Sequence, residues 1–257
     1  MYTGLNYFYV IIVRMGVLKI QYASGLNVSG PLKKYLKPSA PYLALLGNTG
    51  NPNKTSTTEF LCEASKAYER VFLVLGPKDL EGDPFYVKFH RFHEILQKKS
   101  LKNITILNNN VRASNGPFEV LGNAMWSPVY DQKEHSELMV NDTDFVSEKQ
   151  LYDWSVEDEK DLVTDEKRAT ILMSYSLCSD SLTNVVNSRH YVHKMSPGPN
   201  VRAWLCGAGP FSRSSMVGNT LVAVNNFDSP DFSDSKVLEI DSVFNPELCQ
   251  EEVQVLA

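Results

Sequence analysis

The stretch Leu18-Lys19-Ile20-Gln21-Tyr22-Ala23-Ser24-Gly25-Leu26-Asn27 has the pattern of a buried β-strand that runs into a loop. Residues 42–48, 71–78 and 201–208 have the same shape, an apolar run that ends at a glycine. A fifth segment, residues 169–176, ends in small polar residues instead. In α/β folds the carboxyl ends of such strands meet at one edge, where ligands bind. The sequence therefore predicts that any functional region lies where these five segments end.

The composition is that of an ordinary globular protein, with 257 residues, 43% hydrophobic and 21% charged. One large domain is the expected count at this length. The net charge of −5, without a basic block, disfavours nucleic acid as a partner. Four cysteines without pairwise spacing predict reduced thiols in a reducing compartment, not a disulfide framework or a zinc site; they are Cys62, Cys178, Cys206 and Cys249.

Residues 1–14 form an apolar extension ahead of a domain that we expect to cover residues 15–257. Its run Tyr7-Phe8-Tyr9-Val10-Ile11-Ile12-Val13 is too short to span a membrane and has neither the basic start nor the cleavage site of a signal peptide. Its β-branched and aromatic residues suit an edge strand or a docking segment. We favour docking on its own domain.

The intervening segments predict the connections between strands. Ser56-Thr57-Thr58-Glu59 has the pattern of a capping box and predicts a helix to about residue 68, with Phe60, Ala64 and Ala67 facing inward. Residues 43–75 then form a parallel βαβ unit. Asp83-Pro84 predicts a second helix through about residue 99.

The second half is expected to be richer in antiparallel strands and polar loops. Residues 104–109 and 118–126 predict two antiparallel strands about the turn Ser114-Asn115-Gly116, and residues 220–225 predict a hairpin partner for 201–206. Residues 130–168 are acidic and suit a solvated helix face, and the tail from Asp228 has a loop-like composition.

The order of the strand-end loops resembles that of the calcineurin-like metallophosphoesterase family from about residue 19 to residue 244. The resemblance is carried by Ile20-Gln21-Tyr22-Ala23-Ser24, Leu45-Leu46-Gly47 with Gly50-Asn51-Pro52, Phe72-Leu73-Val74-Leu75-Gly76, Val120-Leu121-Gly122 with Trp126-Ser127, and Trp204-Leu205-Cys206-Gly207 with Phe211-Ser212. It implies a four-layer αββα sandwich, in which helices flank two mixed sheets. It also implies a two-metal centre that hydrolyses phosphate esters.

The strand-end positions that carry the family's motifs hold other residues in this chain, and every expected metal ligand is replaced. We call this set the vestigial pocket: Gly25, Asn27, Asn48, Pro77, Lys78, Asp79, Tyr175, Ser176, Ala208 and Pro210. Gly25, Ala208 and the two prolines have no side-chain donor atom. Neutral amides bind a divalent cation poorly without carboxylates. We therefore predict no bound metal, no cofactor and no catalytic residue.

Individual residues of the pocket leave alternatives open. Lys78 is either an anion-binding residue that replaces lost metal charge or a surface lysine, and Asp79 is its nearest candidate counter-ion. Asn27 and Asn48 could bind a ligand, although their side chains more often satisfy their own loops. Tyr175 is predicted to fill the space that the ligands vacated.

Histidines elsewhere do not form a metal motif. His90 and His93, and likewise His190 and His193, are three residues apart without a suitably spaced carboxylate, so we interpret them as surface or packing residues. No Gly-x-Ser-x-Gly elbow marks a nucleophilic serine.

Together these features predict a catalytically inactive pseudoenzyme. It would act as a scaffold or structural subunit that binds other proteins in a larger assembly, such as a virion or an organellar complex, in the cytoplasm or another reducing compartment. The alternative is a non-hydrolysing module that binds a phosphate or a nucleotide in the vestigial pocket. A residual metal-dependent phosphoesterase ranks third.

Overall fold

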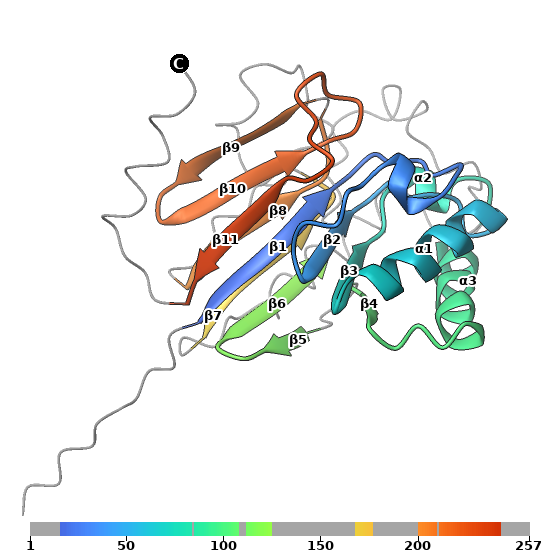
Figure 1. Ribbon diagram of the computed structural model, residues 1–257, viewed down its shortest axis with the longest axis horizontal. Helices are drawn as coiled ribbons and strands as arrows, with labels where there is room; N and C mark the ends of the chain where they lie inside the picture. Colours follow the sequence, from blue (N-terminus) through green and yellow to red (C-terminus); the bar gives the residue numbers. More distant parts are fainter. Residues whose placement is uncertain are drawn as a thin grey trace, which may run out of the picture.

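The computed structural model describes residues 16–83, 85–107, 112–124, 168–176, 200–209 and 211–242. Two β-sheets lie face to face, and the helices cover the outer face of the first sheet (Figure 1). The predicted α/β sandwich of two mixed sheets is therefore confirmed. A helical layer outside the second sheet would fall beyond the described residues.

The first sheet is mostly parallel and has the strand order β11-β1-β2-β3-β4. Its parallel strands are β1 (Val17–Ala23), β2 (Tyr42–Leu46), β3 (Arg70–Val74) and β4 (Ile104–Ile106), and β11 (Val237–Asp241) pairs antiparallel with β1. The carboxyl ends of four neighbouring strands consequently lie along one edge.

The second sheet has the order β5-β6-β7-β8-β10-β9 and carries antiparallel strands at both edges. Its strands are β5 (Arg112–Asn115), β6 (Phe118–Asn123), β7 (Ala169–Ser174), β8 (Val201–Cys206), β9 (Ser212–Val217) and β10 (Thr220–Asn225). The four inner strands run parallel, so their carboxyl ends also share an edge.

The central strands are apolar throughout because both faces of the first sheet are covered. The side chains of Leu43 and Leu45 pack with the helices, whereas those of Ala44 and Leu46, on the opposite face, pack with the second sheet. The covering helices are η1 (Leu32–Lys34), α1 (Thr55–Ala67), α2 (Pro77–Leu80) and α3 (Phe85–Lys98).

The two sheets come into close contact beyond the end of β8. A Cβ atom added at Gly207 would lie 1.6 Å from the carbonyl oxygen of Leu46, so no other residue fits there. Nearby, the buried Trp204 donates its Nε1–H to Oγ of Ser174 at 2.8 Å. The end of β8 is thus fixed against both β2 and β7, which positions the loops of the candidate site.

Several predicted elements are confirmed. Strands β2 and β8 lie within the predicted segments 42–48 and 201–208, and residues 43–75 form a parallel βαβ unit. The capping box is wrong, because α1 begins at Thr55 after Lys54, and the hydroxyls of Ser56 and Thr57 donate to carbonyls of preceding loops. Phe60 and Ala64 are buried as expected, but Ala67 is exposed at the last turn.

The predicted antiparallel pairing of residues 104–109 with 118–126 is wrong. Residues 104–106 form β4, which adds to β3 in parallel because α3 is a crossover that returns the chain to the same sheet. The antiparallel partner of β6 is β5, and Asn115 pairs with Phe118 around a two-residue turn.

Two predictions for the C-terminal part also need correction. Residues 220–225 form no hairpin with β8, because β9 intervenes as the hairpin partner of β10 and leaves β10 parallel to β8. The tail beyond Asp228 is not all loop, since β11 buries Leu238 and Ile240 against β1.

Several predictions fall outside the described residues. They concern the extension 1–14, the acidic segment up to residue 167, and Cys178, Cys249, His190, His193 and Pro210. Cys62 and Cys206 are free thiols. In the described ranges, no helix combines the length and apolar character needed to cross a membrane.

Candidate functional site

The loops that follow β1 and β2 run side by side at the carboxyl edge of the first sheet. The N–H of Gly25 donates to the carbonyl of Gly47 at 3.1 Å, and the N–H of Asn27 donates to that of Asn48 at 2.8 Å. Beyond β8, the N–H groups of Gly207 and Ala208 donate to the carbonyl of Tyr175, at 3.0 and 2.6 Å. Within each sheet, backbone hydrogen bonds thus join the loops that follow neighbouring strands.

The backbone conformation explains the glycines and asparagines of these loops. Gly25 and Gly47 have φ of 69° and 90°, and Asn27 and Asn48 have φ of 43° and 53°. Glycine adopts this left-handed region freely, and asparagine tolerates it better than most residues. The side chain of Asn27 is used locally, because its Nδ2 donates to the carbonyl of Gly25 at 2.9 Å.

The ring of Tyr175 lies in the middle of the vestigial pocket. A Cβ atom at Gly47 would lie 2.5 Å from Cδ2 of Tyr175, and one at Gly76 would lie 3.0 Å from the same atom. The ring therefore packs on two glycines that follow neighbouring strands. With 8% of its surface exposed, Tyr175 occupies space between the ends of the two sheets.

The amide of Asn48 links this tyrosine to the start of α2. Its Nδ2 donates to the hydroxyl of Tyr175 at 3.2 Å, and its Oδ1 accepts the backbone N–H of Lys78 at 2.9 Å. Asn48 itself is buried. Both ends of this amide are therefore engaged within the protein.

Asp79 fastens two strand-end loops from inside. It is 0% exposed, and its Oδ1 and Oδ2 accept the N–H groups of Gly50 and Gly76 at 2.7 and 2.8 Å. Burial raises the pKa of Asp79 to about 7, although the surrounding backbone N–H groups favour the carboxylate and act in the opposite direction.

The prediction that Asp79 is the counter-ion of Lys78 is wrong. In the described part of the chain the two side chains form no ion pair, because the carboxylate is turned inward to the backbone while Lys78 is exposed. Lys78 holds its place through its backbone N–H, which leaves its ammonium group at the surface.

The donor atoms of the vestigial pocket do not fit a two-metal centre. Such a centre needs carboxylate and imidazole ligands that point at a common space. Here the side-chain oxygens of Asn48 and Asp79 accept hydrogen bonds from backbone N–H groups. Gly25, Pro77 and Ala208 have no side-chain atom that could bind a metal. Across the described ranges, no three His, Cys, Asp or Glu residues group closely enough to hold a metal ion. Ser176 is buried, and its N–H donates to the carbonyl of Ala124.

Three polar residues at this edge were missed. Oγ of Ser24 and Nδ2 of Asn226 both donate to the carbonyl of Gly207, at 2.7 and 3.0 Å. Asn225 bridges the carbonyls of Tyr22 and Ser233. The signal was present, since this asparagine pair stands at the end of an apolar strand. The predicted hairpin would make residues 220–225 antiparallel to residues 201–206 and would place these asparagines at the opposite edge of the sheet.

Two of the histidines, His90 and His93, lie on α3 in the helical layer outside the first sheet. His93 packs its ring against Phe89 with centroids 4.6 Å apart. Burial, and secondarily the neighbouring His90, lower the pKa of His93. This packing agrees with the interpretation of the two histidines as surface or packing residues.

The comparisons with known proteins support the fold. No protein-family model matches the sequence, and no curated protein matches it significantly. The phosphopantetheinyl hydrolase PptH from Mycobacterium tuberculosis is similar in structure, with a TM-score of 0.62 and 14% identity over 82% of this chain and 90% of that chain. A protein from Staphylococcus aureus assigned as a 5'-nucleotidase, in complex with alpha-ketoglutarate, gives a TM-score of 0.50 and 11% identity over 88% of this chain and 51% of that chain. At these identities the likeness shows a phosphoesterase-like fold.

Proposed function

We propose that this chain is a catalytically inactive metallophosphoesterase-like protein, a pseudoenzyme that acts as a scaffold or structural subunit of a larger assembly. One observation carries the proposal. At the strand-end edge, where the family that this chain resembles places its metals, Tyr175, Asn48 and Asp79 contact the chain's own residues. The ring of Tyr175 packs on Gly47 and Gly76, while Asn48 and Asp79 bind the backbone.

Physical chemistry supports the loss of catalysis as one consistent change. A cluster of aspartates without cations would repel itself and carry a large desolvation cost. Exchange of such acids for glycine, asparagine and tyrosine removes that cost, while the turn at Gly207 keeps its close contact with Leu46. The fold is then maintained by packing and hydrogen bonds without bound cations, which suits a protein that is used for its surfaces.

The proposal includes the organisation and setting of the chain. Residues 15–257 form one domain, and the extension 1–14 docks on it. Protein partners bind surfaces outside the vestigial pocket. A virion or an organellar complex is the kind of assembly that would use such a subunit. The free thiols of Cys62 and Cys206 support a reducing compartment.

The loss of catalysis is tested on the purified full chain. Its metal content is measured by mass spectrometry, and its turnover of a generic phosphate ester is measured with added manganese, beside an active phosphoesterase as positive control. We expect neither stoichiometric metal nor turnover above buffer. Either result would contradict the pseudoenzyme and favour a residual phosphoesterase.

The scaffold role is tested separately, by affinity capture of the tagged chain from its native source. We expect co-purification with a defined set of partners in a particle much heavier than the monomer. A chain that runs alone and monomeric would refute this role. A thermal-shift screen with phosphates and nucleotides then tests the alternative, because a ligand that binds the folded state raises the midpoint. A shift abolished by Lys78→Gln would favour that binding module in the vestigial pocket.

A further inference from the structure

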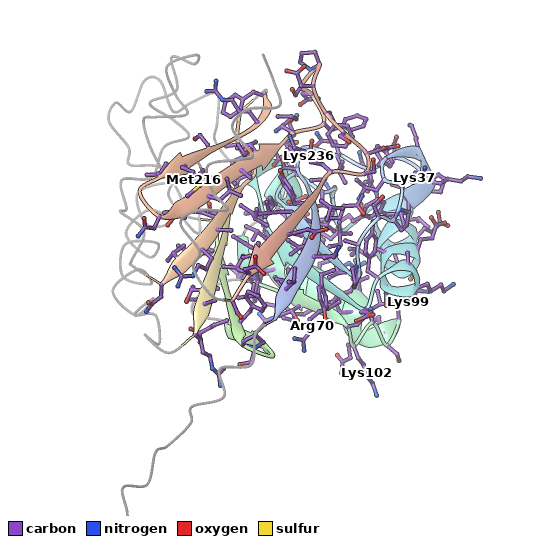
Figure 2. All side chains as sticks on the ribbon, turned by 60° about the vertical axis from the view of Figure 1, so that its left-hand side comes forward. Lys37, Arg70, Lys99, Lys102, Met216 and Lys236 are labelled. Carbon is purple, nitrogen blue, oxygen red and sulfur yellow. The ribbon has the colours of Figure 1, made fainter. Side chains whose placement is uncertain are left out.

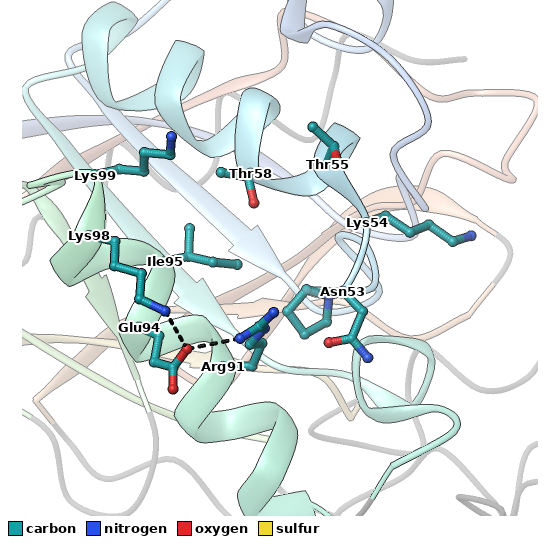
Figure 3. A pocket seen from close by; sticks show the side chains of 10 residues that line it. Asn53, Lys54, Thr55, Thr58, Arg91, Glu94, Ile95, Lys98 and Lys99 are labelled. Atoms are coloured by element: carbon teal, nitrogen blue, oxygen red, sulfur yellow. Dashed lines mark hydrogen bonds and ion pairs between the residues drawn. The ribbon is translucent and has the colours of Figure 1, made fainter.

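A groove of about 260 Å³ separates α1 from α3 on the outer side of the molecule (Figure 3). Four basic side chains line it, from Lys54, Arg91, Lys98 and Lys99, and the single carboxylate among its lining residues is that of Glu94. This is a local concentration of positive charge in a chain whose net charge is −5. An excess of one charge sign in a concave site attracts ligands of the opposite sign.

Glu94 already shows how an anion is held in this groove. Its Oε2 accepts hydrogen bonds from Nη1 of Arg91 and from Nζ of Lys98, both at 2.9 Å (Figure 3). These contacts, that of Lys98 first, lower the pKa of the Glu94 carboxyl. All three side chains are about half exposed or more, and ion pairs at such sites are weak. Arg91 and Lys98 are therefore available to a stronger anion.

The opposite wall adds hydrogen-bonding groups of suitable kind. Thr55 and Thr58 line the groove from α1, across from the basic residues of α3. Ile95 contributes an apolar surface between the basic residues (Figure 3). The residue before the helix, Lys54, makes no side-chain capping bond, so the positive end of the helix dipole adds to the field of the lysines.

We propose that this groove binds a phosphomonoester dianion, with Arg91, Lys98 and Lys99 on one wall and the hydroxyls of Thr55 and Thr58 on the other. The planar guanidinium of arginine matches phosphate in a bidentate geometry. The volume is below the roughly 300–1,000 Å³ of pockets that enclose drug-sized ligands, which favours a phosphoryl group with a small attachment.

The doubly charged phosphate competes with the singly charged Glu94 for the same two cations. The site is separate from the vestigial pocket, because neither Lys78 nor Asn48 lines it. The inference thus goes beyond the scaffold role and stands independently of it. It assigns to the protein a means of recognising phosphorylated molecules.

The full chain is titrated with inorganic phosphate at low salt. Binding is measured by calorimetry and by changes in the amide NMR signals of Thr55 and Thr58. Parallel titrations with O-phosphoserine and a nucleoside monophosphate identify the source of the phosphoryl group. Arg91→Gln and Lys98→Gln should each weaken binding about three- to tenfold, as expected for loss of one charge-assisted contact at a partly exposed site. Glu94→Gln should instead strengthen it by about the same factor, because it frees both cations.

Two lysines serve as controls, each changed to glutamine. Lys102 lies beyond the end of α3, extends outward from the molecule (Figure 2) and does not line the groove, so its loss should leave binding unchanged apart from general charge. Lys78 tests the strand-end edge. Absence of binding at millimolar phosphate would overturn the proposal, as would a Glu94→Gln variant that binds no better. Binding that is lost in Lys78→Gln and kept in Arg91→Gln would place the anion elsewhere and equally overturn it.

Discussion

Truncation of Tyr175 tests whether its ring is a structural filling of the strand-end edge. The side chain is 8% exposed and packs on Gly47 and Gly76. Removal of a buried aromatic ring to alanine typically costs about 3–5 kcal/mol, from lost transfer free energy and the cavity left behind. Tyr175→Ala should therefore lower the free energy of unfolding by about this amount.

A conservative variant separates the ring from its hydroxyl. Tyr175→Phe keeps the packing and loses the contact with Nδ2 of Asn48, which at 3.2 Å is a long hydrogen bond. We expect a cost of about 0.5–1.5 kcal/mol, towards the lower end of that range. The same loss is expected in an Asn48→Ala background to be smaller, because the partner amide is already absent.

Urea and thermal unfolding measure both variants against the natural chain. For a domain of this size each kcal/mol shifts the melting temperature by roughly 2–4 °C, so Tyr175→Ala should melt about 6–20 °C lower. Residues kept for binding or catalysis are commonly neutral or unfavourable for stability, and their removal often stabilises. A Tyr175→Ala variant within about 1 kcal/mol of the natural chain, or more stable than it, would refute a packing role for the ring.

Three further predictions concern the same framework. Burial raises the pKa of Asp79 from an ordinary 3.8 to about 7, so the folded state holds the proton more tightly than the unfolded state. The free energy of unfolding should therefore fall as pH rises from about 4 to 7, which urea unfolding of the natural chain measures. A free energy that does not change with pH, together with an unshifted Asp79 carboxyl signal by NMR, would contradict this prediction. Gly207→Ala should prevent folding or cost more than about 3 kcal/mol, judged by circular dichroism and soluble yield, because its Cβ would overlap the Leu46 carbonyl; a variant that melts normally would disprove the close approach. Lys88 is 1% exposed and binds Asp83 and Asn51, so Asp83→Asn should destabilise the chain because it leaves the buried ammonium group without its carboxylate, whereas the double change with Lys88→Met should cost less; equal losses in thermal unfolding would argue against the ion pair.

The parallel frame could be predicted from the sequence because its signal is local. Each inner strand is a short apolar run, and the residues of β2 and β8 can be read directly from that run. Glycine at positions 47, 76 and 207 marks where the chain turns at the sheet edge. A glycine in the sequence does not show which group packs against it in the fold, such as the carbonyl of Leu46 against Gly207.

The edge strands β11 and β9 could not be predicted, because their own residue patterns are weak. In β11, alternating Leu238 and Ile240 lie among acidic and polar residues, and the strand is held by pairing with β1 at the other end of the chain. Likewise β9 is half exposed and carries serines, so its pattern does not stand out from a loop. Such strands are defined by tertiary pairing more than by their own composition.

The candidate site shows the same division. The replacement of the expected ligands was visible in the sequence, but the direction of each side chain was not. Asp79 and Lys78 are adjacent in sequence. The carboxylate of Asp79 binds the N–H groups of Gly50 and Gly76 inside the fold, whereas the side chain of Lys78 is exposed. The role of Asn226 depended on the direction of β10, which only the sheet order reveals.

The central claim is that the side chains at the strand ends pack on and hydrogen-bond to the chain itself and do not bind cations. Crystals of the full chain grown with excess manganese test it most directly, through anomalous diffraction at the manganese edge. We predict no anomalous peak among Gly25, Asn48 and Tyr175, with the ring and the Asn48 amide in the contacts described above. An ordered manganese ion bound there, with Tyr175 displaced, would contradict the account.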